Sequence, residues 1–71
     1  MSDKIERAKC FTAGRVSARI LHDKELKPFF VGTIGGKCVT MDSKIKHLTR
    51  NSAIDDARKF REHARKAVDA A

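Results

Sequence analysis

The sequence NSAIDDARKFREHARKAVDA, residues 51–70, decides the fold because it predicts one long amphipathic helix. Its apolar side chains recur at the spacing of three and four residues that gathers them on one helical face. They are Ala53, Ala57, Phe60, Ala64, Ala67 and Ala71, with Ile54 and Val68 beside them. Asn51 or Ser52 is the expected N-cap, and Asp55 and Asp56 are expected in the first turn, where they complement the helix dipole. A narrow face rich in alanine predicts close packing of this helix across a sheet.

The residues before this helix predict strands. The segment RVSARI, residues 15–20, alternates between polar and apolar side chains, which is typical of a strand with one buried face. A second strand is expected at 28–34, and the following Gly35-Gly36 pair is a two-residue hairpin signal that leads to a third strand at 37–41. Residues 45–49 form either a fourth short strand or the lead into the helix.

Together these elements predict a single small domain, residues 1–71, of the α+β class. A three-stranded antiparallel sheet forms a β-meander over residues 13–50, and the helix at 51–70 packs across one face of it. Residues 1–12 are either a short N-terminal helix or a disordered basic arm. A chain of this length buries only about 60% of its unfolded surface, so its core is small.

The charge of the chain predicts an anionic partner. The formal net charge is +7 over 71 residues, and residues 1–51 carry +6 of it. The basic surface is therefore expected on the strands and loops, because the helix nearly cancels its own charges. No apolar run is long enough to span a membrane, and two cysteines without a secretory feature favour a reduced cytoplasmic protein. We expect no membrane partner, and either a monomer or a homodimer.

The candidate binding residues lie on the expected outer face of the sheet. If the apolar residues of 15–20 face the helix, then Arg15, Ser17 and Arg19 face outward. Further basic side chains flank the strands and the lead into the helix: Lys27, Lys37, Lys44, Lys46 and Arg50. Phe29 and Phe30 are adjacent and must point to opposite faces, so one is in the core and the other meets solvent or a partner. Phe29 is included in the candidate site, and the choice between the two rings stays open.

The sequence offers no catalytic or metal-binding motif. Three histidines and two cysteines are present, but none has the HxxxH, CxxC or CxxH spacing of a local metal site. The segment Gly-Thr-Ile-Gly-Gly at 32–36 lacks the Lys-Ser/Thr pair and the following helix of a phosphate-binding loop. We therefore expect a non-enzymatic protein that needs no cofactor and no metal.

The predicted element order resembles two families of small nucleic-acid binders. The double-stranded-RNA-binding domain has basic residues at the start of its last helix, whereas this chain has Asp55 and Asp56 there, which argues against that family. Residues 49–64 are similar to the closing helix of the arm-binding domain of phage-type integrases. That resemblance covers about 55 residues by pattern, and it implies that the strand bearing Arg15, Ser17 and Arg19 reads DNA bases.

These observations lead to two functional hypotheses. The first is a small basic protein that binds nucleic acid, duplex DNA in particular, through the exposed basic face of its sheet. Lysines would contact phosphates, while Arg15 and Arg19 would supply sequence preference. The alternative is a small inhibitor or adaptor of the phage or plasmid type, which docks on an acidic surface of a protein partner through an exposed Phe, Met41 and the basic rim.

Overall fold

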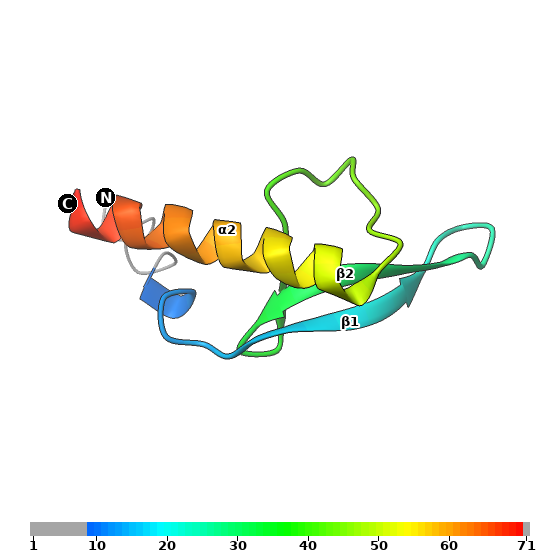
Figure 1. Ribbon diagram of the computed structural model, residues 1–71, viewed down its shortest axis with the longest axis horizontal. Coiled ribbons are helices and arrows are strands. Elements are labelled where there is room, and N and C mark those ends of the chain that lie inside the picture. Colours follow the sequence, from blue (N-terminus) through cyan, green and yellow to red (C-terminus); the bar gives the residue numbers. More distant parts are fainter. Residues whose placement is uncertain (1–8, 71) are drawn as a thin grey trace.

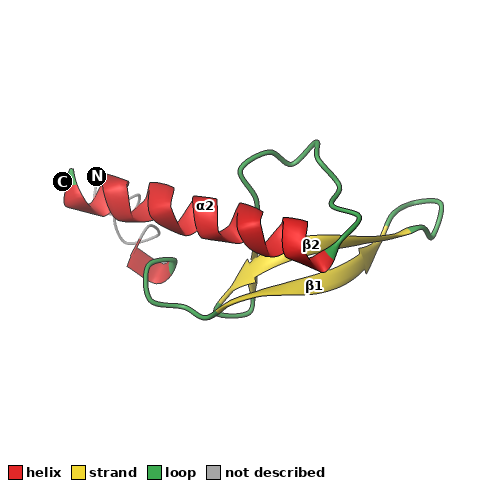
Figure 2. Ribbon diagram, viewed as in Figure 1, coloured by secondary structure: helices red, strands yellow, loops and turns green. Residues whose placement is uncertain are grey.

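The computed structural model of this chain describes residues 9–70. Its strands are β1 (Val16–His22), β2 (Pro28–Ile34) and β3 (Lys37–Val39), and they form one antiparallel sheet in the order β1-β2-β3. Helix α2 (Arg50–Asp69) follows and lies across one side of the sheet (Figure 1). The predicted α+β fold is confirmed (Figure 2). The choice between an N-terminal helix and an arm falls largely on residues 1–8, which lie outside the described residues.

The connections within the sheet follow the turn chemistry of the sequence. Gly35 and Gly36 have φ angles of 59° and 82°, a left-handed conformation that glycine adopts without steric cost. They join β2 to β3, as the sequence predicts. In place of a fourth strand, His47 makes a single antiparallel bridge with Phe30, whose N–H donates to the His47 carbonyl at 2.8 Å. Loop 40–49 therefore runs beside β2 after β3 has ended.

The core lies between the sheet and the alanine face of α2. A Cβ atom on Gly32 would lie 2.5 Å from the Ala53 carbonyl oxygen and 2.6 Å from the Ala57 Cβ, so the absence of a side chain lets the layers approach closely. Ala53, Ala57 and Ala64 are buried as predicted, whereas Ala67 is exposed. The remaining core residues are Ile34 and Val39, with Phe11, Val16 and Phe60 packed against them.

The start of α2 differs from the prediction. Thr49 is the N-cap, and its side chain accepts a hydrogen bond from the Ser52 N–H at 3.2 Å. The prediction that Asn51 or Ser52 is the N-cap is wrong, because the helical backbone already begins at Arg50. As a result Asp55 and Asp56 fall beyond the first turn, which contains no acidic residue.

The two layers are offset along the long axis of an elongated molecule of 41 × 21 × 17 Å. The hairpin formed by β1 and β2 projects beyond the first turn of α2, and the other end of α2 extends away from the sheet (Figure 1). The hairpin tip therefore stands at one end of the molecule and the end of α2 at the other. We call the projecting hairpin, residues 16–34, the ribbon.

Candidate nucleic-acid interface

One face of the sheet is left uncovered by the elements within residues 9–70. Gly32 faces α2, so the side chains before and after it along β2 face away. The strand register extends this assignment across the sheet, because Ala18 and Val39 lie opposite Gly32. The residues that face outward are Ser17, Arg19, Leu21, Phe29, Val31, Thr33 and Cys38. We call these residues, together with the adjoining Arg15, the open face.

The structure brings Arg15, Ser17 and Arg19 together on this open face. They line an open depression of about 570 Å³ with Thr33 and the Gly35-Gly36 turn. An Arg19 Nη2 atom donates to the Gly36 carbonyl at 3.3 Å, which holds the guanidinium beside the turn. Thr33 is buried, so the groups that a phosphate oxygen could reach here are the two exposed guanidinium groups and the half-buried Ser17. The sequence predicted this arrangement from strand alternation alone.

Phe29 also lies on the open face, and Phe30 lies on the face toward α2. The two residues point to opposite faces as predicted, and both are half-buried, so the expected division into one core ring and one exposed ring is not seen. The Lys46 ammonium stands 5.5 Å from the centroid of the Phe29 ring, in cation–π geometry. A base could therefore stack on Phe29 only if Lys46 moved aside.

The other candidate cations do not form a single patch with the arginines. Lys27 lies at the hairpin tip and pairs with Glu25 at 3.2 Å; both side chains are more than 70% exposed, so the pair contributes little stability. Lys37 is on the α2 side of β3, with its ammonium 6.0 Å from the Phe11 ring centroid. Lys44 is in loop 40–49, and Arg50 is the first residue of α2.

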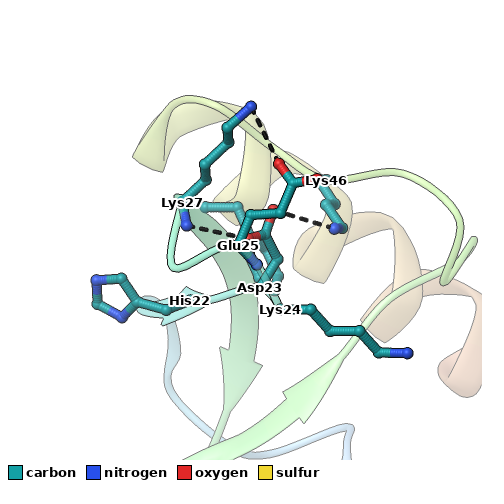
Figure 3. A pocket seen from close by; sticks show the side chains of 7 residues that line it. His22, Asp23, Lys24, Glu25, Lys27 and Lys46 are labelled. Atoms are coloured by element: carbon teal, nitrogen blue, oxygen red, sulfur yellow. Dashed lines mark hydrogen bonds and ion pairs between the residues drawn. The ribbon is translucent and has the colours of Figure 1, made fainter.

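Asp23 organises the tip of the ribbon, where it lies in a pocket drawn in Figure 3. Its Oδ1 atom accepts the backbone N–H groups of Glu25 and Lys27, both at 2.9 Å, and its Oδ2 atom meets the Lys46 ammonium at 3.4 Å. The Lys27 N–H in particular holds the pKa of Asp23 below its ordinary value. The Asp23 carboxylate is therefore ionised at neutral pH, and both of its oxygens already bind groups of this chain, namely two backbone N–H groups and the Lys46 ammonium.

A hydrogen-bond network that the sequence did not predict joins loop 40–49 to α2. The Asp56 carboxylate accepts from the Thr40 hydroxyl at 2.7 Å, from the Met41 N–H at 3.1 Å and from the His47 ring at 3.0 Å. The other His47 ring nitrogen lies 2.7 Å from the Ser52 hydroxyl. Burial alone would raise the pKa of Asp56, but the hydrogen bonds from Thr40, Met41 and His47 outweigh it and lower that pKa.

Ser, His and Asp are also the residue types of hydrolytic triads, and in this chain they join a loop to a helix. Every bond in this network connects loop 40–49 to the first two turns of α2. The backbone N–H of Ser52 is itself held by the cap residue Thr49. Within residues 9–70 no group of three potential metal ligands occurs, and Cys10 and Cys38 are both free thiols.

The sequence also did not reveal the exposed leucine at the tip of the ribbon. Leu26 has a φ angle of 63° and is 78% exposed. Residues 22–25 predicted only a polar connection between strands. No sequence signal could have identified Leu26, because left-handed turn positions are normally marked by Gly or Asn.

Comparisons of the chain with known protein families, curated proteins and solved structures found no match. Among the helices of residues 9–70, none combines the length and the apolar character needed to cross a membrane.

Proposed function

We propose that this chain binds nucleic acid, with duplex DNA as the preferred ligand, through the open face of its sheet. One observation carries the proposal: Arg15 and Arg19 are exposed and flank a polar depression lined also by Ser17 and by the buried Thr33, on a face that no described helix covers. Guanidinium groups bind phosphates and the guanine edge in bidentate geometry, whereas hydroxyl groups accept or donate as the partner requires.

The distribution of charge supports the open face over the helix as the binding surface. On α2, Arg58 pairs with Asp55 at 3.6 Å and Arg65 pairs with Glu62 at 3.3 Å. Arg15 and Arg19, like Lys59 and Lys66 on α2, take part in no ion pair among the described residues. The two arginines differ from these lysines in that no acidic side chain of residues 9–70 lines their depression, whereas Glu62 lies beside Lys59 and Lys66. The charge of the two arginines is available to a polyanion, and a narrow antiparallel sheet has the width to enter the major groove.

Salt-dependent titration tests the proposal. Fluorescence anisotropy with a labelled duplex should show an affinity that falls with added salt, with a slope of about 0.9 for each phosphate contact. The double variant Arg15→Gln/Arg19→Gln should bind more weakly and with a smaller slope. The matched control Arg58→Gln/Lys59→Gln removes the same charge from exposed positions on α2 and should change the slope much less.

Identical affinities and salt slopes for the wild type and the Arg15→Gln/Arg19→Gln variant would contradict the proposal. A labelled single strand of the same sequence tests the preference for duplex DNA, because the chain has no Trp or Tyr to stack on successive bases.

A second candidate function is docking on an acidic surface of a partner protein, as an inhibitor or adaptor. The observation in its favour is the set of exposed apolar side chains near the basic loops, among them Leu26, Met41 and Leu48. Negligible affinity for DNA, together with a stoichiometric protein partner retained from nuclease-treated lysate, would favour this function over the first.

A further inference from the structure

Leu26 combines two features that do not contribute to stability. An L-residue other than Asn or Asp rarely adopts a left-handed backbone, because its Cβ crowds the carbonyl oxygen. Leu26 adopts that conformation with a φ angle of 63°, yet its side chain is 78% exposed and buries little apolar surface. A left-handed residue that exposes a large apolar side chain at a projecting tip presents that side chain to a partner.

The backbone around Leu26 is held in place. The Leu26 N–H donates to the Asp23 carbonyl at 3.0 Å, and the Asp23 N–H donates to the Lys27 carbonyl at 3.1 Å. These bonds define a turn followed by one left-handed residue, a standard three-residue hairpin loop. The Asp23 carboxylate reinforces the loop through its bonds to the Glu25 and Lys27 N–H groups. Leu26 is therefore presented in a defined position at the tip of the ribbon.

The surroundings of Leu26 suit an anionic, stacked polymer. The ribbon carries the tip beyond the first turn of α2 (Figure 1), so an approaching duplex meets no helix there. Glu25 and Lys27 are the chain neighbours of Leu26 and pair with each other at 3.2 Å. Lys24, one residue further, points away from the Asp23 cluster (Figure 3) and adds to the tip a positive charge that is unpaired within residues 9–70. The Asp23 charge is already engaged by the Lys46 ammonium and by backbone N–H groups.

We propose that Leu26 is a wedge that inserts between two base pairs of the bound duplex and kinks it. The inference rests on the proposed DNA-binding function and adds a deformation of the ligand to it. Apolar side chains inserted at a base step partly unstack it and bend the duplex by about 20–90°. A flexible pyrimidine–purine step should be the preferred site, because it unstacks most readily.

Energy transfer between dyes at the two ends of a short duplex with a central TA step measures the bend. The wild type should bring the ends closer together. Leu26→Asn should leave the duplex straight while its affinity changes by less than about tenfold, because unstacking offsets much of what insertion contributes. Asn adopts the left-handed conformation readily, so this variant should retain the hairpin loop. Leu48→Asn is the matched control, since Leu48 is 82% exposed and lies in loop 40–49, outside the ribbon.

The possible outcomes separate this inference from the proposed function. Binding of the duplex by the wild type without a change in end-to-end distance would overturn the wedge and leave DNA binding intact. Equal bending by the wild type and Leu26→Asn would also overturn the wedge. Absence of duplex binding by the wild type would overturn the proposed function, and the wedge with it. Circular dichroism of both variants establishes that they are folded before these results are compared.

Discussion

At the scale of single residues, Gly32 is where the sheet and the helix approach most closely. Gly32→Ala should lower the free energy of unfolding by about 1–3 kcal/mol, because the added methyl group meets the Ala53 backbone and forces the layers apart. Urea denaturation followed by circular dichroism measures the loss. Gly36→Asn is the control, since a Cβ added at Gly36 would meet nothing within 4 Å and Asn tolerates its positive φ. A loss at Gly36 as large as that at Gly32 would contradict the steric explanation.

Asp56 should make the stability of the protein depend on pH. Its pKa in the folded state lies below the ordinary value of 3.8, so the folded protein binds fewer protons than the unfolded chain. The stabilisation is complete above that ordinary pKa and is lost as the pH falls through the lower folded-state pKa. Asp56→Asn should cost about 1.5–3 kcal/mol at neutral pH and should reduce the loss of stability on acidification.

Denaturation titrations at several pH values test this expectation for Asp56. Part of the acid sensitivity should remain in the Asp56→Asn variant, because Asp23 also has a lowered pKa. Asp55→Asn is the matched control, since the Asp55 side chain is 67% exposed and its ion pair with Arg58 is weak. Equal effects of the two substitutions would show that the Asp56 network does not stabilise the fold.

Residue-level features were the least predictable from the sequence. The sequence predicted that Asp56, like Asp55, lies in the first helical turn and complements the helix dipole. Only the folded loop shows that the Asp56 carboxylate binds Thr40, Met41 and His47. The backbone of Leu26 could not be predicted either, because residue preferences do not predict a left-handed conformation at a leucine. Both features depend on contacts between segments far apart in the chain or on strain.

At the scale of elements, Thr49 rather than a later residue begins α2. Thr49→Ala should destabilise the protein by about 1 kcal/mol, because the Ser52 N–H loses its acceptor. Asn51→Ala, two residues further on, should have a much smaller effect, since Asn51 lies within the helix. Thermal denaturation of the two variants makes the comparison, and a larger effect at Asn51 would mean that the helix begins later in solution.

The elements themselves could largely be predicted, because their periodicities differ. Alternation identified β1, and the helical spacing of Ala53 and Ala57 identified the buried face of α2. The ends of the elements could not be predicted. Thr49, Asn51 and Ser52 are all good caps, so composition cannot choose between them. The third strand ends at Val39 instead of residue 41, since Thr40 and the Met41 N–H bind Asp56.

At the scale of the whole molecule, the two thiols provide probes of which surface binds DNA. Cys38 is exposed on the open face, whereas Cys10 is exposed in the segment preceding the sheet. Bound duplex should slow alkylation of Cys38 and leave that of Cys10 nearly unchanged, because it covers only the open face. Mass spectrometry of the alkylated protein measures both rates in one sample. Equal protection of both thiols, or protection of Cys10 alone, would place the DNA elsewhere.

The division of the molecule into a covered and an open face could be predicted, but the shape of the charged surface could not. Strand alternation sufficed for Arg19, which lies in β1, and for Arg15, which directly precedes that strand. The face on which Lys37 lies could not be predicted without the register of β3, which places Lys37 on the helix side. The position of Lys46 could not be predicted without the path of loop 40–49, which brings the Lys46 ammonium over the Phe29 ring.

The offset between ribbon and helix has a further consequence for how the molecule opens. Where the two layers overlap, Gly32 and Ala57 are buried between the sheet and the helix. Amide protons there should exchange with solvent only when the whole chain unfolds, whereas those at the tip and in the last turns of α2 exchange through local opening. Such a gradient makes the tip energetically independent of the core, so the tip can be remodelled without loss of the fold.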